Sequence, residues 1–520
     1  MEQVSLKLLV NEKKNRVLFV EAGKDFVDVL LSFLTLPLGT IARLVRNDES
    51  NVKNVTVGSL SSLYESVAKL DEKQFWTATC KEMLLRPRNS MERYCKNLKL
   101  NINDDTEKTK YFICENRDCN GPDGCCLLST FKNQRCKCGK LMKQEVFPQD
   151  EKNADADHKK VVDDKGFVLD TVFIISDDLN VMPDSLLVSN SLPTDLGCED
   201  FNEMKLVTVH VTEKEVLDLL KCSLFSPTPF TDIFLTGCKE KPNTREAKRE
   251  DVLVLKKQEE FMKSDYDFIL FDFDLKLGRE NPIQIKVMLR KSDNTILFAL
   301  CENDFVDFLL SFLTFPLGGV VYMLDGKCCL GSIDNLYMSV LDLYRYLRSF
   351  DLRDQLLKSQ LAYQFKLRNQ ILPIDEAPAL DYTFVSKYDH NGKLLSGYLT
   401  ASNDVSINQK SCVALRYLAP QSSIGGAYSD RYGGRGLVKK LSRYMVTDEL
   451  AVTPCSSTSI ISFLSKLRIP SSDLEERVIS IGKEEGLSLL RASLVSSSAL
   501  TNGLGPFLGP MIVKKEKWSH

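Results

Sequence analysis

Histidine is scarce in this sequence, with four residues among 520, at positions 158, 210, 390 and 520. So few imidazole groups leave little material for a histidine general base or a Ser-His-Asp triad. The Gly-rich phosphate-binding patterns and the G-x-S-x-G nucleophile motif are also missing from the sequence. We therefore assign no catalytic residues, and the sequence favours a non-enzymatic protein over an enzyme.

An excess of positive charge is missing as well, since 68 Lys and Arg residues face 71 Asp and Glu residues, for a net charge of −3. This balance argues against nucleic-acid binding through bulk charge, which needs a basic face. The sequence has no run of roughly 20 predominantly apolar residues, so we expect no membrane span. Residues 1–15 lack a secretory-signal pattern. The sixteen cysteines are therefore expected as thiols in the reducing cytoplasm or nucleus.

The sequence does contain an internal repeat. Residues 25–39 read DFVDVLLSFLTLPLG and residues 304–318 read DFVDFLLSFLTFPLG, with thirteen of fifteen positions identical. Further matches follow in the same order along each copy, while the offset falls only from 279 to 270. Such ordered self-similarity indicates a tandem duplication of a unit of roughly 230 residues.

Each copy is predicted to combine strand hairpins with helices, which makes an α+β fold with mainly antiparallel sheets and packed helices. In the first copy we expect strands at 6–10 and 16–21 and a helix at 24–34. The predicted layout is copy 1 at 1–237, a charged linker at 238–278, copy 2 at 279–510 and a tail at 511–520. Copy 1 would carry a zinc-ribbon-like segment at 108–147 and a disordered polar segment at 149–165, and copy 2 a flexible insertion at 396–436.

Polar residues in the 24–34 helix and its continuation fall at helical spacing. They are Asp25, Asp28, Ser32 and Thr35, and the second copy keeps them as Asp304, Asp307, Ser311 and Thr314. Spacings of three and four place them on one helical face. We interpret this stripe as a solvated face, with a cation or ligand face as the alternative.

Six cysteines lie close together in the first copy and form the main candidate site. A tetrahedral zinc site is usually supplied by two close cysteine pairs separated by a loop. The predicted ligands are Cys114, Cys119, Cys136 and Cys138, with Cys125 and Cys126 as possible substitutes. The spacings C-x4-C and C-x-C depart from the usual C-x2-C, so ordinary thiols are the alternative. Four thiolate ligands would make a closed, structural zinc site.

Two other functions stay open. One is a carboxylate- and magnesium-dependent hydrolase, because Asp272 and Asp274 follow an apolar run and resemble the first motif of haloacid-dehalogenase-type phosphatases. The other is a weak zinc-ribbon nucleic-acid binder. Its basic residues would be Arg117, Lys132, Arg135, Lys137 and Lys140.

Several strings along the chain can be compared with known families. They are Leu6–Val10, Glu21–Asp28, Leu36–Gly39, Cys136–Met142, Met445–Leu450 and Ser498–Leu504. These strings resemble the plant family known as Domain of Unknown Function 674. The resemblance implies a land-plant origin and the duplicated layout, and it brings no assigned activity and no catalytic residues. We therefore expect an intracellular protein-interaction or scaffold protein with one structural zinc ion, and the oligomeric state stays open.

Overall fold

The computed structural model describes two five-stranded sheets, a six-stranded sheet and the helices packed with them. The described residues are 2–46, 55–96, 98–102, 109–114, 126–132, 134–136, 138–148, 166–184, 203–237, 282–367, 369–378, 382–388, 394–401, 412–418, 436–440 and 443–508. The predicted polar segment 149–165, the linker 238–278 and the tail 511–520 lie outside these residues.

The first sheet is antiparallel throughout and has the strand order β7-β6-β2-β1-β8. Residues of β1 alternate between buried and exposed positions, as in a strand with one face on the core. The predicted hairpin turns at Asn15, whose φ of 45° is in the left-handed region that Asn tolerates. The strands are β1 (Val4–Asn11), β2 (Arg16–Gly23), β6 (Val172–Ser176), β7 (Val181–Pro183) and β8 (Met204–Val211).

The second sheet has the order β15-β14-β10-β9-β16, which matches the first sheet strand for strand. Sequence strings that occur in both halves of the chain occupy matching strands, so that Phe19 in β2 corresponds to Phe298 in β10. Both sheets carry a register shift at the matching place of the first hairpin. In the first sheet, the partners of Leu9 and Val10 are Phe19 and Val17 of β2, so that Leu18 is passed over. In the second sheet, the shift falls between Ile296 and Phe298 of β10, so that Leu297 is passed over. The strands are β9 (Ile283–Arg290), β10 (Thr295–Cys301), β14 (Tyr444–Thr447), β15 (Val452–Pro454) and β16 (Leu474–Ile481).

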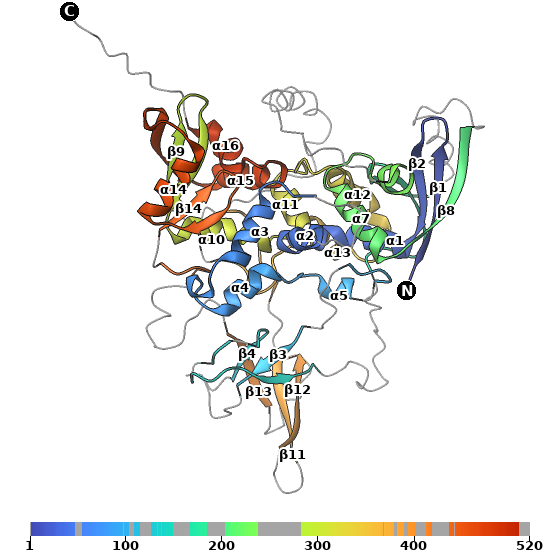
Figure 1. Ribbon diagram of the computed structural model, residues 1–520. Helices are drawn as coiled ribbons and strands as arrows, with labels where there is room; N and C mark the ends of the chain where they lie inside the picture. The colour runs from blue at the N-terminus through green and yellow to red at the C-terminus, as the bar shows by residue number, and fades with distance from the viewer. Residues whose placement is uncertain are drawn as a thin grey trace, which may run out of the picture.

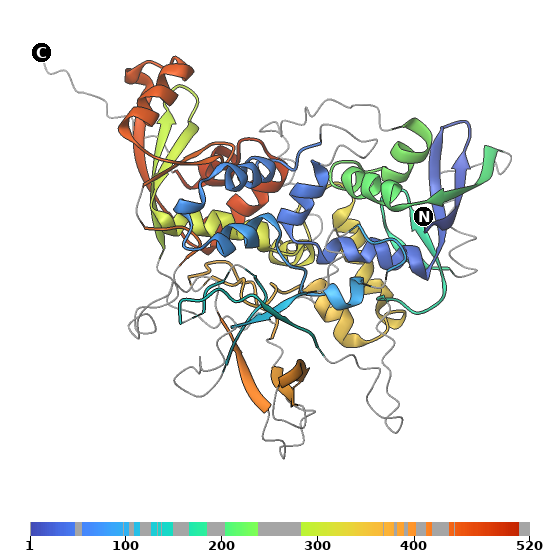
Figure 2. The ribbon, with the colours of Figure 1, turned by 60° about the horizontal axis from the view of Figure 1, so that its bottom comes forward.

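These two sheets stand at opposite sides of the molecule, with most of the helices between them (Figures 1 and 2). The predicted helix at 24–34 is present as α1 (Lys24–Ser32) with a 3₁₀ turn at Phe33–Thr35, and a new helix starts after Pro37. The first half also contains α2 (Leu38–Val45), α3 (Leu60–Lys69), α4 (Ala78–Leu85), α5 (Glu92–Cys95), α7 (Glu213–Ser223) and α8 (Pro229–Thr231). The second half contains α10 (Asn303–Ser311), α11 (Leu317–Met323), α12 (Ile333–Asp342), α13 (Phe350–Leu357), α14 (Ser457–Leu467), α15 (Lys483–Val495) and α16 (Ala499–Leu504).

The two halves of the chain contact each other through reciprocal interactions. The backbone N–H of Leu38 donates to the carbonyl of Phe315 at 2.9 Å, and the N–H of Leu317 donates to the carbonyl of Leu36 at 2.9 Å. One buried hydrophobic cluster includes residues of both halves. Because each half supplies the same contact to the other, the two halves form one core.

Helices of each half also cross to the sheet of the other. The hydroxyl of Ser66 in α3 accepts the N–H of Val452 at 2.9 Å. In the reverse direction, the hydroxyl of Ser339 in α12 accepts the N–H of Val181 at 2.8 Å. Buried backbone groups need such partners. Each helix therefore supplies a hydrogen-bond acceptor to an edge strand of the other half's sheet.

Both halves also build the third sheet, which lies below the helices in Figure 1. Its order is β12-β11-β13-β4-β3-β5, and β13 pairs with β4 in parallel while the remaining pairs are antiparallel. This parallel pair joins the first half to the second. The strands are β3 (Tyr111–Ile113), β4 (Cys126–Ser129), β5 (Gln144–Val146), β11 (Tyr382–Tyr388), β12 (Leu394–Ala401) and β13 (Cys412–Tyr417).

Part of the range 396–436, for which a flexible insertion is predicted, forms strands of this sheet. Strand β12 extends to Ala401, and β13 lies wholly inside this range. Leu399 and Leu415 are buried against strands β3, β4 and β5 of the first half. This burial of apolar area stabilises the two strands.

The predicted α+β fold with mainly antiparallel sheets is confirmed. Among the helices that the structure describes, none is long and apolar enough to cross a membrane.

Candidate metal centre

A tight turn between β4 and β5 positions two of the predicted metal ligands, Cys136 and Cys138. The N–H of Cys136 donates to the carbonyl of Lys140 at 2.8 Å, and the N–H of Gly139 donates to the carbonyl of Cys136 at 2.9 Å. Gly139 has a φ of +87°, which a residue with a side chain rarely adopts. The glycine after Cys138 is thus required by the turn that presents both thiols.

The third predicted ligand, Cys114, directly follows β3 and faces this turn. The Sγ atoms of Cys114, Cys136 and Cys138 all lie within 4.8 Å of one another. The Sγ atoms of Cys114 and Cys138 are 3.5 Å apart. Thiolates around a tetrahedral zinc ion are about 3.8 Å apart, given a Zn–S bond of about 2.3 Å. The donor set and its spacing therefore fit a metal ion that prefers sulfur ligands.

The remaining predicted ligands are not placed by the structure. Cys119 and Cys125 lie outside the described residues. Cys126 begins β4, but the position of its side chain is not described. The structure thus brings together three of the four preferred ligands, of which Cys114 and Cys136 are buried and Cys138 is exposed.

A residue from the second half of the chain packs against the thiol cluster. Leu418, which follows β13, packs with Cys114, Cys136 and Met142 in one small hydrophobic cluster. The buried side chain of Gln134 donates to the carbonyl of Leu418 at 3.1 Å. A metal bound here would therefore stabilise a sheet that both halves share.

The polar stripe on α1 and α10 is not a solvated face, and that prediction is wrong. Asp25 and Asp304 are exposed, but the remaining members are buried. Oδ1 of Asp28 accepts the N–H groups of Phe167 and Val168 at 2.6 and 2.8 Å. In the second half, Oδ1 of Asp307 accepts the N–H groups of Leu437 and Val438 at 2.8 and 2.9 Å. The two carboxylates thus anchor matching backbone segments.

A glycine precedes each anchored segment and makes room for the carboxylate. A Cβ atom on Gly166 would lie 1.9 Å from Oδ2 of Asp28, and one on Gly436 would lie 1.5 Å from Oδ2 of Asp307. The contact of each buried aspartate with a segment that follows a glycine was not predicted from the sequence. Its signal was the match of Gly166-Phe167-Val168 with Gly436-Leu437-Val438 at the offset of 270 found elsewhere in the repeat.

Replacing Asp307 by asparagine is expected to flatten the pH dependence of stability. Burial raises the pKa of Asp307 from 3.8 to about 7, against the lowering effect of the backbone hydrogen bonds from Val438 and Leu437. The folded chain then binds this proton more tightly than the unfolded chain, so stability is lost as the pH rises from about 4 through about 7. Asparagine keeps an acceptor oxygen and carries no charge.

Urea unfolding at several pH values between 4 and 8 tests this prediction. The stability of Asp307→Asn relative to the wild type should increase with pH, by about 1.4 kcal/mol for each unit of pKa shift. Asp25→Asn removes an exposed carboxylate from the matching helix and should leave the profile parallel to that of the wild type. If the stability of Asp307→Asn followed the same pH dependence as that of the wild type, the raised pKa of Asp307 would be refuted.

Other sequence candidates are spread over several places. Asp272, Asp274, Arg117 and Lys137 lie outside the described residues. The basic side chains of Lys132, Arg135 and Lys140 are exposed beside the thiol turn, where Arg135 donates to the carbonyl of Gly139 at 3.1 Å. The structure therefore places only part of the basic cluster and none of the hydrolase motif.

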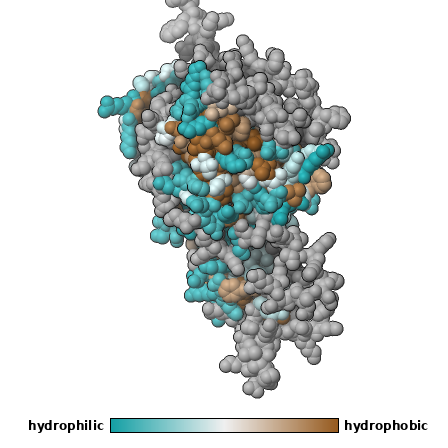
Figure 3. Space-filling view, turned by 90° about the vertical axis from the view of Figure 1, so that its right-hand side faces the viewer, coloured by the Kyte–Doolittle hydropathy of each residue, from teal (hydrophilic) through white to brown (hydrophobic). Residues whose placement is uncertain are grey.

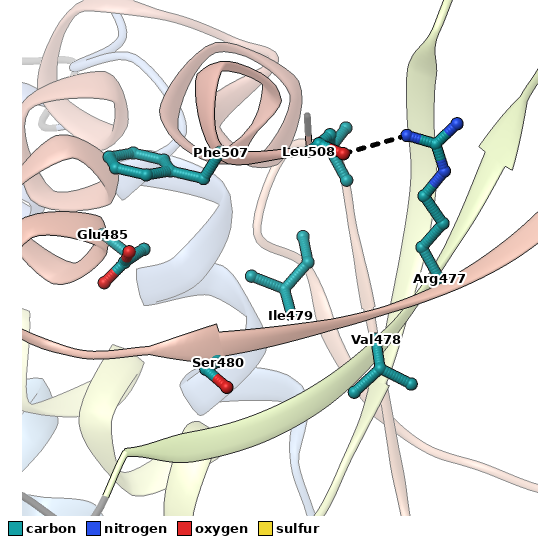
Figure 4. A pocket seen from close by; sticks show the side chains of 7 residues that line it. All are labelled: Arg477, Val478, Ile479, Ser480, Glu485, Phe507 and Leu508. Carbon is teal, nitrogen blue, oxygen red and sulfur yellow. Dashed lines mark hydrogen bonds between the residues drawn. The ribbon is translucent and has the colours of Figure 1, made fainter. Parts of the chain in front are cut away.

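A surface pocket lies along β16, the edge strand of the second sheet (Figure 4). It is lined by Arg477, Val478, Ile479, Ser480, Glu485, Phe507 and Leu508. Its two charged side chains already have structural partners. Arg477 donates to the carbonyl of Leu508 at 3.0 Å, and Glu485 accepts the N–H of Gly482 at the start of α15 at 2.9 Å. Both charged side chains that line this pocket therefore have structural roles.

These features define an α+β protein in which two matching sheets share a helical core and a third sheet carries a thiol cluster. A family model described as protein of unknown function, DUF674, matches residues 1–484, and the chain belongs to that family. The resemblance seen in the sequence is thereby confirmed. Comparisons with curated proteins and with solved structures found no match.

Proposed function

We propose that the thiol cluster binds one structural zinc ion. Cys114, Cys136 and Cys138 supply three thiolates at suitable distances, and Cys119 supplies the fourth. Cys125 and Cys126 are the alternative sources of the fourth ligand. With four thiolates the site is closed to substrate, so the metal stabilises the fold and takes no part in chemistry.

We infer further that the chain is a tandem duplication, with copies at 1–237 and 279–510 joined by residues 238–278. The identical strand order of two sheets supports this inference. So do the reciprocal hydrogen bonds between Leu38 and Phe315 and between Leu317 and Leu36. The zinc ligands belong to the first copy alone, so the two copies have different roles.

The function that fits these features best is a non-enzymatic protein-interaction or scaffold protein in the cytoplasm or nucleus. The observation that supports this proposal is the sheet built by both halves, which has the thiol cluster next to its strand β3. The buried carboxylates Asp28 and Asp307 also support a structural role, because Oδ1 of each accepts two backbone N–H groups.

Affinity capture from a native extract, with the full chain as bait, tests the interaction role. We expect a defined partner that is retained by the wild type at physiological salt and quantified by mass spectrometry. A screen of small-molecule and phosphate substrates runs beside it. Turnover that disappears in Asp272→Asn, or capture of no protein above the background of an unrelated bait, would contradict the proposal.

A further inference from the structure

A pocket of about 490 Å³ lies between α3 of the first half and the hairpin of β14 and β15 in the second sheet. Ligand pockets in proteins commonly have volumes of roughly 300–1,000 Å³, so this one has room for a small molecule. Its walls come from α3 with the segment that follows it and from the hairpin, and they include Ser62, Glu65, Asp71, Glu449, Ala451 and Val452. Because each half supplies one wall, the pocket depends on the contact between the two halves.

The matching place in the other half is where α12 meets the hairpin of β6 and β7. There, Nδ2 of Asn335 donates to the backbone carbonyl and to Oδ2 of Asp178, at 3.0 and 3.1 Å. The hydroxyl of Ser339 donates to Oδ1 of Asn180 at 3.1 Å. Two asparagine side chains, one from the helix and one from the hairpin, therefore bridge the two elements.

The pocket has shorter side chains at both asparagine positions. The strings that occur in both halves match Ser62 to Asn335 and Ala451 to Asn180. The backbone frame is the same in the two places, since a matching serine hydroxyl of each helix accepts an N–H group of the facing strand. The space that the asparagines occupy beside α12 is therefore part of the pocket beside α3.

The charged residues of the pocket leave two carboxylates without a balancing charge. Glu65 pairs with Lys69 at 2.8 Å and with Arg46 at 3.7 Å. Asp71 and Glu449 are exposed, and within the part of the chain that the structure describes neither forms an ion pair. Two such carboxylates on one pocket favour a cation over an anion as its ligand.

Apolar residues supply much of the remaining wall. Leu70 and Val452 are buried, and Pro454 lies beside them in the lining. Ligand pockets typically combine such apolar surface with a few polar groups that fix the orientation of the ligand. The pocket therefore suits a ligand that has an apolar body and one positive charge.

We propose that this pocket binds a small organic amine. The ammonium group lies near Asp71 and Glu449, and the apolar body contacts Leu70 and Val452. This inference goes beyond the proposed interaction role, because it gives the chain a small-molecule ligand. It is also independent of the metal proposal, since the lining of the pocket includes none of the three clustered thiols.

Isothermal titration calorimetry of the full chain with phenethylamine tests the proposal near neutral pH, where an aliphatic amine is charged. Two probes of similar shape, 2-phenylethanol and phenylacetate, replace the ammonium group by a neutral and by an anionic group. We expect saturable binding of one amine per chain. The alcohol should bind about fivefold more weakly, since an exposed ion pair contributes up to about 1 kcal/mol, and phenylacetate should bind more weakly still.

The variant Ser62→Asn/Ala451→Asn places the asparagines of the other half in the pocket. It should bind phenethylamine about tenfold or more weakly, because the two amides occupy the volume of the ligand. Circular dichroism shows whether this variant is folded.

Glu449→Gln removes an exposed charge and keeps the size of the side chain. It should bind the amine about three- to fivefold more weakly and the alcohol as tightly as the wild type does. Glu72→Gln is the matched control, because Glu72 is exposed next to Asp71 and does not line the pocket. This control should bind both probes like the wild type.

Exposed apolar surface elsewhere on the chain competes for the apolar body of the amine. Figure 3 shows such a surface on the side of the molecule where the first sheet stands, with apolar residues gathered in one patch and hydrophilic residues around it. Leu206 of β8 in this sheet is 60% exposed. Leu206→Glu should leave the affinity for the amine unchanged, and a changed affinity would place the amine at the first sheet and contradict the proposal.

Three further results would overturn the proposal: no saturable binding of phenethylamine, equal affinities for the three probes, or wild-type affinity in the folded Ser62→Asn/Ala451→Asn variant. If that variant does not fold, Glu449→Gln decides, and wild-type affinity for the amine in this variant contradicts the proposal. The variant Cys136→Ser/Cys138→Ser should bind the amine normally, which separates this test from that of the metal centre.

Discussion

Replacing Cys136 and Cys138 together by serine is expected to abolish zinc binding and to open the outer part of the third sheet. Structural zinc sites of this class contribute roughly 10–16 kcal/mol of binding free energy in small domains. Strands β3, β4 and β5 have three to four residues each and take part in two small apolar clusters. We expect this buried area to be too small to keep the strands in place without the metal.

Hydrogen exchange read by mass spectrometry measures this effect. Amide protection should fall by several orders of magnitude in 111–113, 126–129 and 144–146, and should persist in the first and second sheets. A control variant, Cys329→Ser/Cys455→Ser, removes two thiols outside the cluster and should exchange like the wild type. Equal protection of the third sheet in both variants would mean that the thiols have no structural role.

Replacing Gly166 by alanine is expected to destabilise the chain by roughly 3 kcal/mol or more. The φ of +76° disfavours a side chain, and the new Cβ would lie 1.9 Å from Oδ2 of Asp28. The carboxylate must then move away from the N–H groups of Phe167 and Val168, which leaves buried polar groups without partners.

Gly237→Ala is the matched control, because Gly237 has a φ of +68° and a Cβ atom added there would meet no atom within 4 Å. This variant should be destabilised by only about 1 kcal/mol, which is the conformational cost of a side chain at positive φ. Urea unfolding should rank the two variants clearly, and Asp28→Ala added to Gly166→Ala should cost less than the two single changes combined. Equal stabilities for Gly166→Ala and Gly237→Ala would refute the role assigned to Asp28.

Much of the first and second sheets could be predicted from local patterns. The hairpin of β1 and β2 follows from alternating apolar residues around a polar turn, and α1 follows from its apolar run. The repeat shows which strings occupy equivalent places, as Phe19 and Phe298 do. Helix α14 has a clear serine cap at Ser456, but only the tertiary structure shows that it covers a sheet face.

The other parts of the fold and the metal centre depend on contacts between residues far apart in the sequence, which a local pattern does not contain. Asp28 was predicted to be solvated because its partner Phe167 lies 139 residues away. The third sheet escaped prediction because β13 and β4 come from different halves and pair in parallel. For the metal centre, cysteine spacing indicated Cys114, Cys136 and Cys138 correctly as neighbours, while the support from Leu418 was invisible in the sequence.

The most direct test is the zinc content of the purified full chain, measured by elemental analysis after extensive dialysis. The full chain is required because β4 pairs with β13 of the second half. The account predicts one zinc ion per chain, and none in Cys136→Ser/Cys138→Ser. A folded wild-type chain without zinc, or with zinc that the double variant retains, would contradict it.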